Sequence, residues 1–105
     1  MPQDFTFETI LDQTISTSTP AKVVSVAGFR EFSLLARFEG PPSSQIRFEI
    51  NHNNLLVAQE IVELNADGWL NFAKVYPVFA PNIGVVFYHP PANLKVRMTI
   101  YAARG

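Results

Sequence analysis

The stretch that decides the fold runs from Phe32 to Ile50 and reads FSLLARFEGPPSSQIRFEI. On both sides of the GPPSS segment, apolar residues alternate with polar ones, a period of two that is typical of half-buried β-strands. The side chains that share the apolar face are Phe32, Leu34, Ala36, Phe38, Ile46, Phe48 and Ile50. Glycine, proline and serine between the two runs favour a turn, so the stretch predicts an antiparallel hairpin.

The charges on the other face predict the register of this hairpin. Pairing Phe38 with Phe48 places Arg37 opposite Glu49. Shifting the strands so that Arg37 opposes Arg47 would bring like charges together, and cross-strand pairs are worth about 0.2–1 kcal/mol each. The first register is therefore expected.

The same kinds of run recur along the rest of the chain, at a spacing typical of all-β sandwiches and barrels. In the first expected strand, Phe5, Phe7, Thr9 and Leu11 share one face. Residues 55–64 fit neither strand nor helix periodicity well; we expect a strand with a bulge near Gln59, and a short helix is the alternative. The expected strands outside the hairpin are residues 5–11, 21–26, 55–64, 69–75, 83–88 and 94–102.

The fold class that follows is all-β: an antiparallel β-sandwich, jelly-roll-like, with about eight strands. At 105 residues the chain has the size of one domain, so we expect a single domain over residues 1–105, with residues 1–13 either an N-terminal strand or an arm. In strand number and spacing the chain resembles small jelly-roll modules of the galactose-binding or discoidin type. The resemblance implies the fold and assigns no site residues.

The alternation also predicts the core, in which side chains from several strands are buried together. The expected members are Leu34, Ala36, Phe38, Phe48, Ile50, Val85, Phe87, Val96, Met98 and Ile100.

Composition excludes several classes of partner. The formal net charge is −1 and the eight Lys and Arg residues are scattered, whereas nucleic acids and anionic membranes require a concentrated basic field. Charged residues make up only 16% of the chain, against about 25% in an average globular protein. One interpretation is a neutral surface rich in Ser, Thr and Asn. The other, which we favour, is an apolar face buried in a homo-oligomer, either a dimer or a trimer.

The termini and reactive residues give few functional signals. The N-terminus has neither a basic start nor an unbroken apolar run, so we expect no signal peptide, no transmembrane segment and, by default, a cytoplasmic location. There is no cysteine, and His52 and His89 stand alone beside turns. We therefore expect no catalytic residues, no metal site and no cofactor.

Aromatic residues beside turns are the strongest functional signal. Trp69 follows Asp67-Gly68, and Tyr76 lies in a connection rich in proline. Asn71 and Asn82 are near in sequence and could donate and accept hydrogen bonds. Sugar rings stack on exposed aromatic faces flanked by such polar groups.

These observations support two functional hypotheses. The main one is a non-catalytic, self-assembling structural or scaffold module, because it explains the scarcity of charge. The alternative is a carbohydrate- or small-ligand-binding module that uses Trp69, Tyr76, Asn71 and Asn82.

Overall fold

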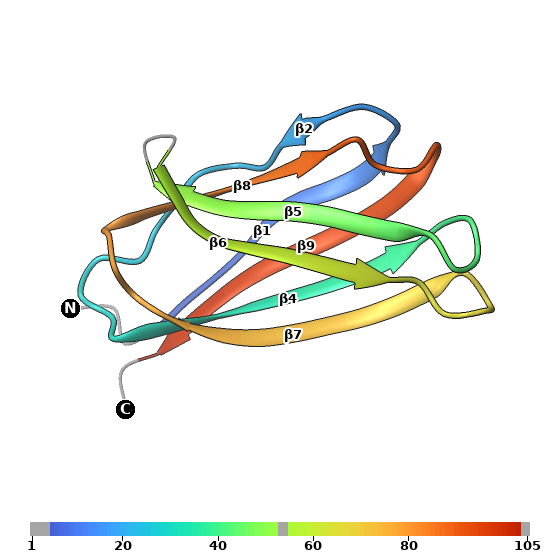
Figure 1. Ribbon diagram of the computed structural model, residues 1–105. Coiled ribbons are helices and arrows are strands. Elements are labelled where there is room, and N and C mark those ends of the chain that lie inside the picture. Colours follow the sequence, from blue (N-terminus) through green and yellow to red (C-terminus); the bar gives the residue numbers. More distant parts are fainter. Residues whose placement is uncertain (1–4, 53–54, 104–105) are drawn as a thin grey trace.

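The computed structural model describes residues 5–52 and 55–103, which form nine strands and no helix (Figure 1). Among these residues, no helix is long and apolar enough to span a membrane. The strands are β1 (Phe5–Ile15), β2 (Thr19–Pro20), β3 (Val24–Ser25), β4 (Glu31–Glu39), β5 (Gln45–His52), β6 (Leu55–Glu63), β7 (Trp69–Pro77), β8 (Asn82–Tyr88) and β9 (Leu94–Ala103).

The strands make two antiparallel sheets that pack face to face (Figure 1). One sheet has the order β1-β9-β4-β7 and the other the order β2-β8-β5-β6, with β3 also paired to β8. Each sheet interleaves strands from the two halves of the chain, as in a jelly roll built from two Greek keys. The predicted β-sandwich is therefore confirmed.

The predicted hairpin of β4 and β5 is wrong, because these strands lie in different sheets. β4 pairs with β7 and β9, and β5 pairs with β6 and β8. Phe38 and Phe48 face each other across the core, with ring centroids 6.1 Å apart. Residues 40–44 thus carry the chain from one sheet to the other, and the expected pairing of Arg37 with Glu49 does not occur.

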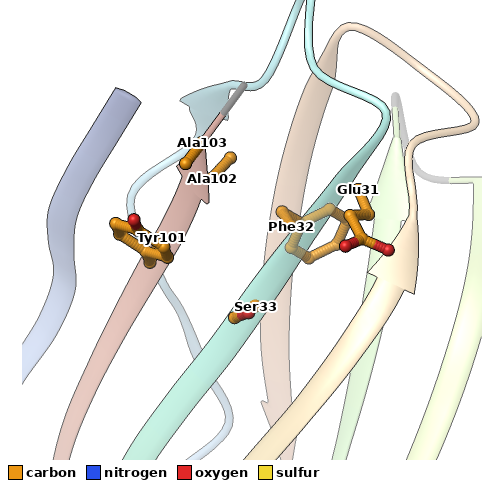
Figure 2. Close-up of a pocket in the computed structure, with 6 residues that line it drawn as sticks. All are labelled: Glu31, Phe32, Ser33, Tyr101, Ala102 and Ala103. Atoms are coloured by element: carbon orange, nitrogen blue, oxygen red, sulfur yellow. The ribbon is translucent and has the colours of Figure 1, made fainter. Parts of the chain in front are cut away.

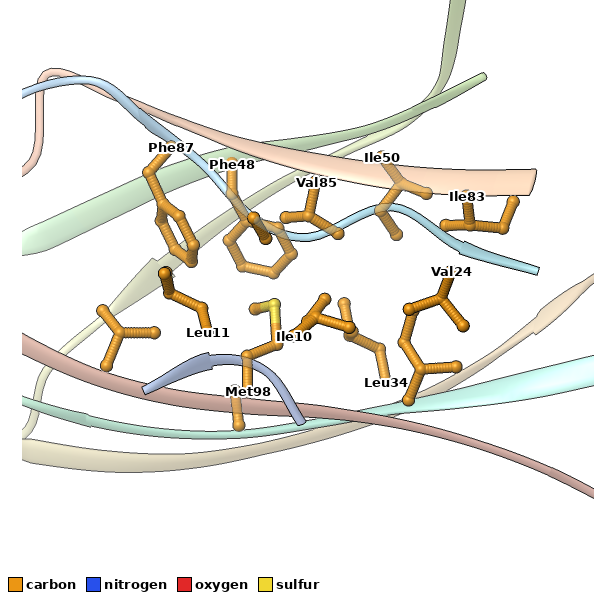
Figure 3. Close-up of a cluster of buried hydrophobic side chains, with 14 of the residues drawn as sticks. Ile10, Leu11, Val24, Leu34, Phe48, Ile50, Ile83, Val85, Phe87 and Met98 are labelled. Atoms are coloured by element: carbon orange, nitrogen blue, oxygen red, sulfur yellow. The ribbon is translucent and has the colours of Figure 1, made fainter. Parts of the chain in front are cut away.

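Side chains from both sheets meet in one core, and all ten residues predicted to be buried together lie in it. Figure 3 shows Phe48, Ile50 and Phe87 of one sheet pointing toward Leu34 and Met98 of the other. The alternation of β9 is as expected, since Leu94, Val96, Met98 and Ile100 are completely or almost completely buried. This core fixes which face of each sheet is left for solvent.

Two strands depart from strict alternation at bulges. In β1 the register with β9 shifts between Thr9 and Leu11, so Leu11 points inward while Phe5 and Phe7 are exposed. The single face expected for these residues is wrong for Leu11, because an extra residue reverses side-chain direction. The expected bulge in β6 lies at Val57 rather than near Gln59, since the register passes from Ala58 to Leu56.

Candidate functional site

The outward-facing side chains of β1, β9, β4 and β7 form what we call the outer face, and its two ends differ in chemistry. The strand register places its residues in rows that cross the sheet. At the polar end, one row is Asp12, Arg97, Arg37 and Asn71, and the next is Thr14, Lys95, Glu39 and Trp69. At the apolar end, the rows are Thr9, Thr99, Leu35 and Ala73, followed by Phe7, Tyr101, Ser33 and Val75.

A tight turn fixes Trp69 at the start of β7. The Asn65 side-chain oxygen accepts hydrogen bonds from the backbone N–H groups of Asp67 (2.9 Å) and Trp69 (3.2 Å). Gly68 has a φ of 83°, and a Cβ atom there would lie 2.5 Å from the carbonyl oxygen of Gly40. The Gly40 N–H in turn donates to the Gly68 carbonyl at 2.9 Å. Trp69 is thus held firmly while 38% of its surface is exposed.

Arg37 connects this ring to the polar groups around it. Its guanidinium carbon lies 4.7 Å from the centroid of the Trp69 ring, a distance at which cation and aromatic ring attract. Its Nη1 donates to Asn71 Oδ1 at 3.0 Å, and its Nη2 lies 3.4 Å from Glu39 Oε1. The other Glu39 oxygen lies 3.7 Å from Lys95 Nζ. The polar end therefore sets a flat apolar ring beside oriented hydrogen-bonding groups.

Arg97 is the cation of the polar end that forms no ion pair among the described residues. It stands opposite Arg37 of β4 on one side and opposite Asp12 of β1 on the other. Like charges directly opposite each other on neighbouring strands are destabilising. Within residues 5–52 and 55–103, no group forms a hydrogen bond or an ion pair with the Arg97 side chain. Its donors are therefore available to a ligand.

Two hollows meet at these arginines. One, of about 330 Å³, is lined by residues of β4, β7 and β9, among them Arg37, Asn71 and Arg97. The other, of about 300 Å³, is lined by Asp12, Arg37, Glu39, Lys95 and Arg97. Both volumes are at the lower end of the roughly 300–1,000 Å³ common for small-molecule sites.

A third hollow lies at the apolar end, between the start of β4 and the end of β9 (Figure 2). Ser33 and Tyr101 are among the residues that line it, and its volume is about 100 Å³. It is too small to enclose a sugar ring. Recognition of a larger ligand is therefore expected at the polar end.

Of the four residues predicted as a ligand site, the structure brings Trp69 and Asn71 together and separates the other two from them. Tyr76 is 6% exposed and stacks on Phe32 in the core, with ring centroids 5.4 Å apart. It lies seven residues after Trp69 on the same strand, so the two side chains point to opposite faces. Asn82 begins β8 in the other sheet, where its carbonyl oxygen lies 2.8 Å from His52 Nδ1.

The Tyr76 hydroxyl is instead a buried polar group near Glu60. It makes no hydrogen bond of acceptable geometry within residues 5–52 and 55–103. Burial raises the pKa of this hydroxyl above its usual range, and the negative charge of Glu60 raises that pKa further. Glu60 itself forms an ion pair with Lys74 at 2.9 Å. Tyr76 therefore stays neutral and takes no part in the outer face.

Sequence reasoning missed Arg37 and Arg97 as site residues. Their outward orientation follows from the alternation of β4 and β9, but their proximity depends on the pairing of strands that are far apart in the chain. Among the described residues, no group of three or more His, Asp or Glu side chains is placed to hold a metal ion. The polar end is thus a surface of cations, one ring and amide groups.

No family model and no curated protein matches the chain. Solved structures with the same fold include a carbohydrate-binding module of the CBM4 type, with a TM-score of 0.54, 16% identity, and coverage of 96% of this chain and 68% of that one. The apo CBM1 of BiXyn10A matches with a TM-score of 0.52, 10% identity, and coverage of 95% and 90%. The family GH115 4-O-methyl-α-glucuronidase BtGH115A, specific for decorated arabinogalactans, matches with a TM-score of 0.59 and 9% identity. The match covers 95% of this chain and 16% of that one.

At these identities the likeness concerns the fold. The galactose-binding or discoidin type stays a prediction, whereas the broader expectation of a β-sandwich module is confirmed. The chain shares its β-sandwich fold with carbohydrate-binding modules.

Proposed function

We propose that this protein is a carbohydrate-binding module whose site is the polar end of the outer face, centred on Trp69. The observation that carries the proposal is the Trp69 ring, which is 38% exposed, follows the Asn65 turn, and has the Arg37 guanidinium over it, with Asn71 bonded to that guanidinium. The proposed role is binding without catalysis.

The chemistry of a sugar ring fits this surface. One face of a pyranose carries C–H groups that pack against an aromatic ring, while its edge carries hydroxyls that need directional partners. The part of the Trp69 ring that the Arg37 guanidinium leaves uncovered supplies the apolar contact. The Arg37 guanidinium supplies donors, and the Asn71 amide supplies both a donor and an acceptor.

The comparisons support this proposal better than the self-assembling scaffold that the composition favoured. Two of the structures with the same fold are carbohydrate-binding modules, and each covers nearly all of this chain. A shared fold does not transfer a function, so the proposal depends on the polar end itself.

A glycan array followed by isothermal titration tests it. Wild-type protein should bind at least one oligosaccharide, and Trp69→Ala should weaken that binding by about tenfold, since a stacked ring is worth about 1 kcal/mol or more. Because Trp69 points away from the core, the substitution should leave the fold intact. Circular dichroism checks this point.

Phe79→Ala is the matched control, because Phe79 is an aromatic residue that is 71% exposed and lies outside the rows of the outer face. It should bind as the wild type does. The proposal fails if no glycan binds, or if Trp69→Ala binds as tightly as the wild type.

Self-association remains a second proposal, and the apolar end of the outer face supports it. Phe7 and Val75 are exposed there. The rings of Phe7 and Tyr101 form an edge-to-face pair with centroids 6.2 Å apart. An exposed apolar group of this kind is typical of a contact between subunits, which buries about 800 Å² per subunit when of standard size.

Light scattering coupled to gel filtration at micromolar concentration tests this second proposal. A dimer or trimer mass for the wild type, reduced to the monomer mass by Phe7→Ser, would support it. A single peak at the monomer mass, unchanged on dilution, would exclude it.

A further inference from the structure

We propose that the polar end prefers acidic saccharides, in which a sugar carries a carboxylate, and that Arg97 together with Arg37 binds this carboxylate. The inference rests on the proposed carbohydrate-binding function and adds to it the chemical class of the ligand. Its starting point is the position of the two guanidinium groups on neighbouring strands.

Electrostatic attraction within the protein does not explain why these two arginines lie opposite each other. Residues directly opposite on antiparallel strands are about 4.5–5.5 Å apart at Cα, and Arg37 is directly opposite Arg97. In the neighbouring row, by contrast, Glu39 stands opposite Lys95 and forms an ion pair with it. One row is therefore electrostatically balanced, whereas the row beside it holds a like-charge pair.

The charges around the pair do not neutralise it. Three cations and two anions lie in these two rows: Arg37, Arg97, Lys95, Asp12 and Glu39. Glu39 is already shared between two cations, at 3.4 and 3.7 Å. Asp12 stands opposite Arg97 but makes no ion pair with it within 4.0 Å. These two rows thus hold three cations against two anions, and the Arg97 guanidinium is the cation that makes no ion pair within residues 5–52 and 55–103.

A carboxylate fits this excess charge better than a neutral hydroxyl does. The planar guanidinium offers parallel N–H donors that match the two oxygens of a carboxylate, and such charged hydrogen bonds are about twice as strong as neutral ones. Both hollows of the polar end are lined by Arg37 and Arg97. Arg37 contacts the Trp69 ring and stands opposite Arg97, so an acidic substituent of a sugar at Trp69 would lie near the arginine pair.

The test compares each acidic oligosaccharide with its own methyl ester, which keeps the sugar and removes the charge. Galacturonate and glucuronate oligomers and their esters are titrated calorimetrically at low and at physiological salt. At least one acid should bind about tenfold more tightly than its ester, the factor that corresponds to one charge-assisted contact. Added salt should weaken binding of the acid and leave binding of the ester unchanged.

Arg97→Gln should reduce the preference for the acid, measured within the variant as the ratio of the affinity for each acid to that for its ester, from about tenfold toward one. Its thermal midpoint should be equal to or above that of the wild type, because a like-charge pair is lost. Arg47→Gln is the matched control, since it removes the same charge from an exposed position in the other sheet. It should keep the preference.

The outcomes separate this inference from the function on which it rests. If saccharides bind but each acid and its ester bind equally, or if Arg47→Gln and Arg97→Gln have the same effect, the inference is overturned and the binding function stands. If no saccharide binds at all, the proposed function fails and the inference fails with it.

Discussion

Replacing Phe48 with alanine tests the core that aligns the two sheets. Phe48 is completely buried on β5. Its ring centroid lies 5.5 Å from that of Phe87 in the same sheet, and 5.4 and 6.1 Å from those of Phe72 and Phe38 in the other sheet. The ring therefore touches both layers, and neither layer can fill its place without moving toward the other.

The expected loss follows from this geometry. Truncating a buried phenylalanine to alanine costs about 3–5 kcal/mol, and the cost rises with the volume of the cavity that remains. The surrounding side chains keep the two sheets apart, so little collapse of the cavity is expected. The loss of unfolding free energy should therefore be in this range. A domain of this size is stable by roughly 5–15 kcal/mol, and 1 kcal/mol corresponds to about 4–8 °C. The thermal midpoint should then fall by at least about 12 °C.

Urea unfolding followed by tryptophan fluorescence measures the loss, because Trp69 is the one tryptophan and lies outside the core. Phe79→Ala serves as control: its side chain is 71% exposed, and exposed substitutions usually change stability by about 0.5 kcal/mol or less. A loss below about 1 kcal/mol for Phe48→Ala, or equal losses for the two variants, would refute the assigned core.

Two further predictions concern the turn before β7 and the buried tyrosine. Gly68→Ala should lower the free energy of unfolding in urea by about 1–3 kcal/mol, because the added Cβ meets the Gly40 carbonyl oxygen at a positive φ; unchanged stability would contradict the turn geometry. The pKa of Tyr76 is higher in the folded than in the unfolded protein, so above about pH 10 wild-type stability should fall with a slope approaching 1.4 kcal/mol per pH unit from this group. Tyr76→Phe should lack this contribution, and parallel curves of stability against pH for the two proteins would disprove it.

Much of the fold could be predicted because side-chain alternation is a property of the strand itself. The inward residues of β4, β5 and β9 could be identified from a period of two, and they lie in the core. Strand pairing could not be found in the same way. A strand alternates identically in either sheet of a sandwich, so the pattern in residues 32–50 identifies two buried faces without showing that they oppose each other.

The candidate site was predicted in part for the same reason. Trp69 and Asn71 have the same parity within β7, and the structure places them on one face. The proline at position 77 predicts that Tyr76 belongs to a connection, whereas the structure places Tyr76 in β7, an edge strand that tolerates proline at its end. Arg37 and Arg97 are 60 positions apart in the sequence, and only the pairing of β4 with β9 brings them together.

The polar end of the outer face contains features that folding alone does not require. An exposed tryptophan and two arginines in direct opposition each lower stability or fail to increase it. Sequences generally satisfy local preferences throughout a fold, and violations concentrate where a protein performs its function. Trp69 and the arginine pair lie together at one end of the outer face, whereas the core beneath that face follows the expected pattern. This contrast is a structural reason to look for the ligand at Trp69 and Arg97.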